Sequence, residues 1–239
     1  MLPADVALDD VHRWVAPFLD RRGARVLEVG CGPGDLARRL GAAGLDVTAL
    51  DQELAGQAPA VGVRWVEADF LTYDDRPFDA VLFTRSLHHI DPLDRAVEQA
   101  ARLVVPGGLL LVDEFDREAA DADTARWYYE VQELLAAAAL YPADRIHGAP
   151  DADPRARWRG EHDHDPPLHT GTEMLAAIAD RFGGMKTRRG AYLYRTIASR
   201  LDPTDRGAAV AQRVHDAETR RLRAAALAPV GLRITAVAS

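Results

Sequence analysis

Apolar residues follow two different spacings along this chain, and the two spacings alternate. Short runs rich in apolar residues predict β-strands at residues 24–30, 45–51, 63–70, 78–85, 107–115, 186–199 and 230–239. Apolar residues three or four positions apart predict helices at 8–21, 34–44, 92–104, 117–140, 172–182 and 204–226. Because strands alternate with helices and runs such as "GGLLLVDEF" have almost no polar face, the pattern predicts an α/β fold with a doubly wound, mostly parallel sheet.

Residues 142–170 interrupt this alternation. The stretch is rich in Pro, Asp, Arg and His, and it is too long for a plain connection between two elements. We therefore expect one domain over residues 1–239, with an insertion at about 117–182 that covers the substrate. Residues 142–170 are compatible with a lid or with a partly mobile segment, and residues 158–169 are also compatible with an exposed acidic loop.

The bulk composition restricts the cellular setting. The chain has 239 residues, a formal net charge of -8 and a single cysteine, Cys31, so no disulfide forms within it. A reducing, cytoplasmic location fits that cysteine content. The N-terminus shows no signal-peptide pattern and no run approaches ~20 apolar residues, so we expect no membrane span. The negative charge disfavours non-specific binding to nucleic acid.

A carboxylate lies inside the first predicted strand. In "VLEVGCGPGD" (residues 26–35), Glu28 stands among apolar residues, and a buried carboxylate needs a partner. The turn that follows has glycines at 30, 32 and 34, but Asp35 stands where the dinucleotide pattern G-x-G-x-x-G has its third glycine. Both observations argue against a dinucleotide. A ligand with an ammonium group would supply a partner for Glu28.

An ordered set of motifs carries a family resemblance. "VLEVGCGPG" is followed by Asp51 at the end of the second strand, then by "EADF", "FDAVLFTRSLHHI" and "LVVPGGLLLVDEF". Over roughly residues 20–115 this order resembles the class I methyltransferases that use S-adenosylmethionine (SAM). The resemblance implies a seven-stranded, Rossmann-like sheet with an antiparallel final strand. It also implies SAM at the carboxyl ends of the first four strands, with S-adenosylhomocysteine as product.

The resemblance assigns the methionine and ribose ends of the cofactor. Glu28 and the backbone of residues 30–34 hold the methionine end, and Asp51 accepts both ribose hydroxyls. The residues assigned to cofactor binding are Glu28, Gly30, Cys31, Gly32, Gly34, Asp51, Gln52, Asp69, Phe70, Thr84 and Arg85. Cys31 also has a simpler interpretation as a small turn residue.

The adenine and the transferable methyl group are assigned in the same way. Asp69 accepts from the adenine amine, the backbone N–H of Phe70 faces the ring, and Thr84 and Arg85 border the methyl group. Asp51 and Asp69 are equally compatible, taken singly, with helix-capping or turn roles. Their register with the glycine turn favours the cofactor roles.

His88 and His89 are the candidate catalytic residues. They follow the fourth strand, where family members place residues that face the substrate, and a histidine titrates near neutral pH and can take a proton from the acceptor. Packing beneath the following helix is the alternative for each. Arg85 and His88 stand where some members have metal-binding carboxylates, so we expect no metal at this segment.

A second histidine cluster lies at residues 158–169. His162, His164 and His169, with Asp163 and Asp165, form H-x-H-x4-H, which matches no structural zinc spacing. We favour a lid over a metal site.

We therefore predict a SAM-dependent methyltransferase, monomeric or homodimeric, that methylates an oxygen or nitrogen of a small molecule. Methylation of RNA or protein is the runner-up among enzymes. A SAM-binding module without turnover remains an alternative of another class, because fold alone does not imply function.

Overall fold

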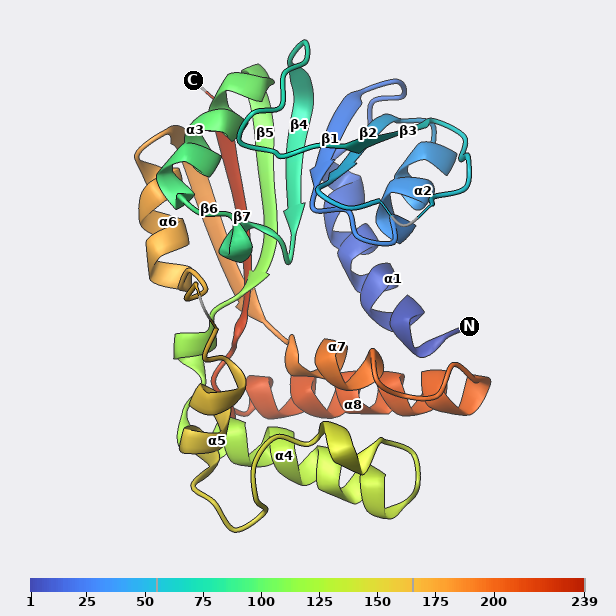
Figure 1. Ribbon diagram of the computed structural model, residues 1–239, viewed down its shortest axis with the longest axis vertical. Coiled ribbons are helices and arrows are strands. Elements are labelled where there is room, and N and C mark those ends of the chain that lie inside the picture. Colours follow the sequence, from blue (N-terminus) through green and yellow to red (C-terminus); the bar gives the residue numbers. More distant parts are fainter. Residues whose placement is uncertain (55, 165, 239) are drawn as a thin grey trace. The chain divides into compact units, whose positions relative to one another are not determined.

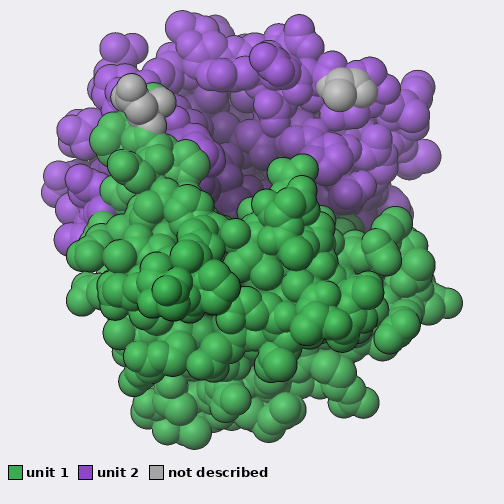
Figure 2. Space-filling view, turned by 60° about the horizontal axis from the view of Figure 1, so that its bottom comes forward, with its two compact units in different colours: residues 1–10, 115–168, 189–231 green, residues 11–114, 169–188, 232–239 purple. Residues whose placement is uncertain are grey.

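The computed structural model describes residues 1–54, 56–164 and 166–238. The chain forms two compact units, coloured separately in Figure 2. Unit 1 comprises residues 1–10, 115–168 and 189–231, and unit 2 comprises 11–114, 169–188 and 232–239. The predicted single domain with a cover at 117–182 stays a prediction, and the boundary after Leu168 falls within that cover.

Unit 2 is built on a seven-stranded sheet in the order β3-β2-β1-β4-β5-β7-β6 (Figure 1). The strands are β1 Arg25–Val29, β2 Asp46–Asp51, β3 Val63–Glu67, β4 Phe78–Thr84, β5 Val104–Phe115, β6 Phe182–Gly190 and β7 Gly231–Ala238. The first five pair in parallel, and β7 runs antiparallel to β5 and β6. The predicted doubly wound fold with an antiparallel final strand is confirmed.

The chain forms helices in both units. They are α1 Pro3–Val15, α2 Asp35–Ala42, α3 Leu93–Leu103, α4 Ala122–Ala137, α5 Pro154–Glu161, α6 Gly171–Ala179, α7 Leu193–Ala198 and α8 Asp205–Arg223. Residues of α3 and α6, such as Val97 and Ile178, share one core with alternate residues of the central strands, such as Leu27 and Phe83. The opposite side of the same strands, for example Val26, is equally buried. Two-sided burial explains the continuous apolar runs of the sequence.

The strand register brings the loops that carry the candidate site to one edge of the sheet. Val29 pairs with Leu50 on one side and with Phe83 on the other, and Thr84 pairs with Asp113. Because these strands are parallel, the segments that follow β1, β2 and β4 leave the sheet together. Open α/β sheets bind their ligands at this carboxyl edge.

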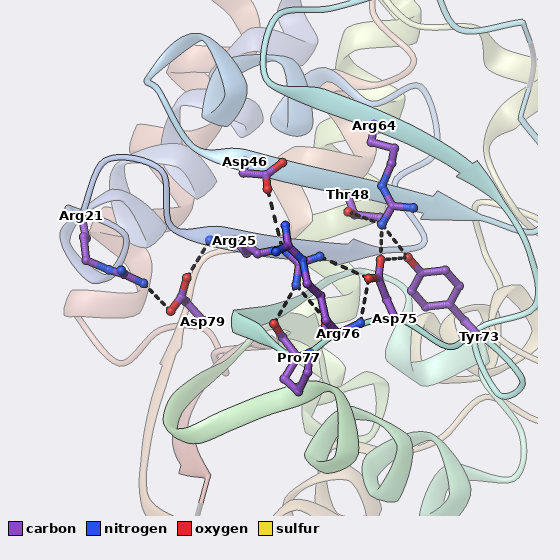
Figure 3. A network of polar contacts seen from close by, with 10 residues as sticks. All are labelled: Arg21, Arg25, Asp46, Thr48, Arg64, Tyr73, Asp75, Arg76, Pro77 and Asp79. Carbon is purple, nitrogen blue, oxygen red and sulfur yellow. Dashed lines mark hydrogen bonds and ion pairs between the residues drawn. The ribbon is translucent and has the colours of Figure 1, made fainter.

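The opposite, amino edge is held by a polar network (Figure 3). The Arg25 guanidinium donates to the carbonyl oxygens of Arg76 and Pro77 and to Asp75. Asp75 also accepts from the Tyr73 hydroxyl at 2.7 Å and forms an ion pair with Arg64. The loop that leads into β4 is thereby fixed to the starts of neighbouring strands.

Unit 1 consists mainly of helices around an aromatic core. Tyr128, Tyr129 and Trp158 are buried there, and the hydroxyls of both tyrosines donate to Glu161 at 3.2 and 2.8 Å. Asp153 caps the helix α5 by accepting from the backbone N–H of Ala156, so part of the irregular stretch 142–170 is helical. Asp153 followed by Pro154 is an N-cap signal that the sequence already contained.

Several predicted elements have different bounds in the structure, and the first helix and the strand at 186–199 differ most. The predicted helix 8–21 begins at Pro3 and ends at Val15, followed by a 3₁₀ turn at Ala16–Phe18. The predicted strand 186–199 ends at Gly190, and residues 193–198 form the helix α7.

The buried carboxylate of Glu218 explains why residues 193–198 form a helix and not a strand. It accepts from the backbone N–H groups of Tyr192, Leu193 and Tyr194 at 2.7 to 3.0 Å. These are the N–H groups that a helix N-terminus leaves without a partner in its own turn. A contact from 24 to 26 residues away therefore starts a helix where the local pattern favours a strand. In the parts of the chain that the structure describes, no helix has the length and apolar character needed to cross a membrane.

Candidate functional site

Glu28 lies in β1, one residue before the strand ends, and only 2% of its surface is exposed. Its Oε1 accepts a long hydrogen bond of 3.4 Å from the Thr84 hydroxyl. Its Oε2 is buried and has no hydrogen-bond partner among the described residues. A buried carboxylate oxygen without a donor is costly, so this atom marks a place where a cationic or hydrogen-bonding ligand group would be stabilised.

Burial raises the pKa of Glu28 from 4.5 to about 8. The Thr84 hydroxyl and the nearby Ala37 backbone N–H lower the pKa by less, and the carboxylates of Asp35 and Asp51 raise it further. Without a ligand, this carboxyl group is therefore mostly protonated at neutral pH.

The glycine turn after β1 is shaped by close approaches. Gly30, Gly32 and Gly34 have φ of 69°, 52° and 78°, in the left-handed region that glycine tolerates best. A Cβ at Gly30 would overlap Ser86, and a Cβ at Gly34 would overlap the ring of Trp65. A Cβ at Gly32 would meet nothing within 4 Å, so there is open space beside this residue.

Cys31 belongs to the same turn and is buried. Burial, with the nearby carboxylates of Glu28 and Asp51, raises its thiol pKa to about 12. The thiol stays protonated at neutral pH, so it is no nucleophile. This agrees with its interpretation as a small turn residue.

Asp51 ends β2 and contacts the glycine turn directly. Its Oδ2 accepts from the Gly32 N–H at 2.7 Å, and its Oδ1 lies 3.4 Å from the Glu53 N–H. A carboxylate has about four acceptor positions, so further donors can still bind. The next residue, Gln52, is exposed.

Asp69 and Phe70 follow β3. Asp69 is exposed, and its Oδ1 accepts from the Leu71 N–H at 2.9 Å, the geometry of a turn residue. The Phe70 ring is buried and packs edge-on against Phe83, with centroids 5.4 Å apart. The side chain of Phe70 is thus a core residue, and only its backbone is available to a ligand.

Thr84 and Arg85 mark the end of β4. Thr84 contacts Glu28 as described, and the Arg85 side chain is exposed. The backbone of Arg85 has φ of 57°, which is rare for a residue with a side chain. Its N–H donates to the Asp113 carbonyl at 2.9 Å, which holds that conformation. Strained backbone of this kind is common at functional sites.

The two candidate catalytic histidines have different surroundings. His88 is buried, and its Nδ1 lies 2.5 Å from Oε2 of Glu114. The other carboxylate oxygen of Glu114 accepts from the Leu87 N–H at 2.8 Å. His89 is exposed, and its ring lies 4.1 Å from that of His88.

Glu114 is a residue that sequence reasoning missed. It is completely buried in β5. The signal was present, because "LLLVDEF" places two acids in an otherwise apolar strand. That is the same anomaly that pointed to Glu28 in β1. Its neighbour Asp113 is paired with Arg233 at 2.7 Å.

The described histidines at 162 and 169 contact backbone carbonyl groups. His162 Nδ1 lies 2.8 Å from the Trp158 carbonyl oxygen, and His169 Nε2 lies 3.2 Å from that of Ile90. Burial lowers the pKa of His162. Within residues 1–54, 56–164 and 166–238 no three His, Cys, Asp or Glu side chains are grouped as metal ligands. Asp165 lies outside the described residues.

Comparison with known proteins agrees with this architecture. Residues 5–149 match the model of the family described as methyltransferase domain. The chain is 30% identical over 173 residues to demethylmenaquinone methyltransferase of Renibacterium salmoninarum, covering 64% of this chain and 73% of that one. It is 36% identical over 115 residues to ubiquinone biosynthesis O-methyltransferase of Xylella fastidiosa, covering 44% and 47%.

The fold is shared with solved methyltransferases of very different sequence. The N-methyltransferase NodS of Bradyrhizobium japonicum, in complex with S-adenosylhomocysteine, superposes with a TM-score of 0.54 at 10% identity, covering 98% of this chain and 86% of that one. The sheet order and the carboxylate-flanked glycine turn thus define a class I methyltransferase architecture. The chain belongs to the methyltransferase domain family and is a SAM-dependent enzyme.

Proposed function

We propose that this protein transfers the methyl group of SAM to an oxygen or nitrogen of a small-molecule acceptor. The observation that carries the proposal is the unpartnered Oε2 of Glu28, buried at the carboxyl edge of the sheet beside an open glycine turn. SAM has an ammonium on its amino-acid moiety that suits this carboxylate. When bound, SAM supplies an activated methyl group on a sulfonium.

Different residues around Glu28 would bind different parts of SAM. Glu28 and the backbone at Gly30–Gly34 would hold the methionine moiety, and Asp51 would accept from the ribose hydroxyls. Asp51 is already oriented by the Gly32 N–H, so little side-chain freedom is lost when a ribose binds. Gln52, exposed beside Asp51, is placed near the same moiety in this proposal.

The adenine and methyl ends would be bordered by the next two loops. Asp69 would accept from the adenine amine, and the Phe70 backbone N–H would donate to the ring. Thr84 and Arg85 would border the methyl group, with Thr84 also holding Glu28 in place. The strained Arg85 backbone supports a functional role for this turn.

We assign the proton-accepting role to the loop after β4. Glu114 accepts from His88 Nδ1, so His88 would exchange a proton with the acceptor through Nε2. His89, exposed beside it, is the alternative base. A base is needed only if the acceptor atom carries a proton to lose, since the methyl donor is already activated. Alignment and exclusion of water supply the rest of the rate.

A small acceptor is supported by the names of the relatives, which act in menaquinone and ubiquinone chemistry. The acidic net charge also disfavours a nucleic acid. A cytoplasmic location remains part of this proposal, in line with the unpaired Cys31.

The test has two stages. Calorimetry with SAM measures binding to wild type, to D51A and to E98Q, a control at an exposed acid of α3. Loss of hydrogen bonds to a carboxylate costs about 1.5–3 kcal/mol, so D51A should bind SAM roughly ten- to a hundredfold more weakly.

Turnover is tested next with methyl-labelled SAM and a metabolite panel that begins with demethylated quinols. If His88 or His89 is the general base, its replacement by alanine should lower the rate of methyl transfer by about 10²–10⁴-fold and leave the affinity for SAM unchanged. SAM binding without turnover on any acceptor would favour the non-catalytic module. If D51A bound SAM with the same affinity as wild type, Asp51 would not be part of the cofactor site.

A further inference from the structure

Unit 1 carries an apolar groove between the helices α4 and α8, which lie next to each other in Figure 1. Its volume is about 410 Å³, and nearly all of its lining is apolar. Trp127, Val131 and Leu135 form the α4 side, and Val210 and Val214 belong to the α8 side. An open apolar groove of this kind on a folded protein usually marks an interaction site.

An exposed leucine extends this apolar surface. Leu134 exposes 71% of its surface and is one of few large hydrophobic residues exposed in the described chain. It lies seven residues after Trp127, which is two helical turns, so both project from the same side of α4. The apolar surface therefore continues from the groove onto the outer side of α4.

The two edges of this surface carry opposite charges. On α8, Arg206, Arg213 and Arg220 recur every seven residues, and the first two border the groove. On α4, Asp123 and Glu130 are also seven residues apart. At 100° per residue they lie about 120° and 140° around α4 from Leu135 and about 40° and 60° from Trp127, on the flank of the helix that is farther from α8.

The order across the face is thus an acidic row, an apolar centre and an arginine row. Asp123 forms an ion pair with Arg126 within α4, and Arg213 lies 3.8 Å from Asp216 within α8. These pairs are exposed, and such pairs contribute little, so they can be exchanged for contacts with a partner.

We propose that this face is the interface of a homodimer, with a two-fold axis that runs along the groove. Rotation about that axis lays α4 of one copy over α8 of the other. The acidic row of each copy then meets the arginine row of its partner, and Leu134 of each copy reaches the partner's groove. A two-fold axis across the groove would instead stack α4 on α4 and place like charges together.

The size of the face indicates the strength of the association. With 16 residues, α4 is about 24 Å long, and two adjacent helices are about 20 Å wide. The footprint is roughly 500 Å² per copy, below the ~800 Å² per partner of a standard interface. We therefore expect a dissociation constant in the micromolar range.

Analytical ultracentrifugation from about 1 to about 200 µM tests the proposal. Wild type should pass from monomer to dimer over this range. E130R and R213E should each weaken the dimer at least about tenfold, and L134S should weaken it as well. R188E, the same charge reversal at an exposed arginine of β6, is the control and should dimerise like wild type.

An equimolar mixture of E130R and R213E separates this arrangement from others. Each contact of the mixed dimer joins opposite charges again, so the mixture should associate nearly as well as wild type. Thermal melting of every variant verifies that it folds.

Three outcomes overturn the proposal. A wild type that stays monomeric at 200 µM has no such interface, including the case in which it binds anionic phospholipid vesicles through the arginine row instead. A dimer insensitive to all three variants forms elsewhere. Weakened single variants whose mixture does not recover exclude the packing of α4 over α8.

Discussion

At the scale of single residues, Glu28 has the most unusual environment of the candidate site. It is buried without a cation, with Thr84 as a weak donor and with the carboxylates of Asp35 and Asp51 nearby. The pKa near 8 means that about nine-tenths of the molecules carry a proton on Glu28 at pH 7. An ammonium beside this group favours its ionised form.

Binding of SAM should therefore release a proton. We expect close to one proton per SAM bound at pH 7, and a smaller number above pH 8. Calorimetry in phosphate and in Tris, whose ionisation enthalpies differ, measures it directly. The variant E28Q should release no proton and bind SAM weakly, whereas E98Q should behave as wild type. An observed binding enthalpy that is identical in both buffers for wild type would contradict the assignment.

The same residue should limit the stability of the ligand-free protein. The folded pKa of Glu28, about 8, lies above its ordinary value of 4.5. Ionisation therefore favours the unfolded state increasingly as pH rises from about 4.5 to about 8. E28Q should have a larger free energy of unfolding than wild type at pH 8, by up to a few kcal/mol, and a similar one at pH 4. Urea unfolding at both pH values measures the difference. If E28Q were less stable than wild type at pH 8, the ionised Glu28 carboxylate would not destabilise the folded protein, and this expectation would be wrong.

At the scale of elements, the network of Figure 3 holds the amino edge of the sheet. Burial raises the pKa of Asp75, but hydrogen bonds from Tyr73, Arg64 and the Arg76 backbone outweigh it and lower the pKa to about 2. A lowered pKa contributes stability that is complete above the ordinary value of 3.8 and is lost as pH falls toward 2.

Replacing Asp75 by asparagine should therefore cost stability at neutral pH. We expect a loss of about 2 kcal/mol at pH 7 that shrinks between pH 4 and pH 2. Urea unfolding of wild type and D75N at pH 7, 5 and 3 tests this, and D74N is the exposed neighbour for comparison. Equal losses at pH 7 and pH 3 would mean that packing, and not the charge of Asp75, explains the effect.

At the scale of the whole molecule, cofactor binding and folding are linked. A ligand that binds only the folded protein, at a concentration of 100 times its dissociation constant, raises the free energy of unfolding by about 2.7 kcal/mol. For a chain of this length that corresponds to a rise of roughly 5–10 °C in Tm, at about 2–4 °C per kcal/mol. S-adenosylhomocysteine should produce this rise in a thermal-shift assay and NAD should not, because Asp35 and Glu28 disfavour a dinucleotide. A rise with NAD alone would refute this interpretation of the glycine turn.

The sequence by itself determined the sheet and singled out the residues proposed to form the site. Strands buried on both faces must be apolar at nearly every position, so β1, β2, β4 and β5 were visible without a structure. Glu28 stood out because a carboxylate inside such a run is costly. The glycine turn could be recognised in the sequence because few residues other than glycine tolerate a positive φ. These signals are local, which is why one sequence was enough.

The tertiary structure decided what depends on residues far apart in the chain. Residues 193–198 are helical because Glu218 accepts their first N–H groups. His88 was a visible candidate, but its contact with Glu114, 26 residues away, follows only from the pairing of β4 with β5. That Glu28 keeps one oxygen without a partner is also a property of the packed site. The spacing of apolar and polar residues along the chain reflects secondary-structure propensity and burial. These contacts depend instead on which strands and helices come together.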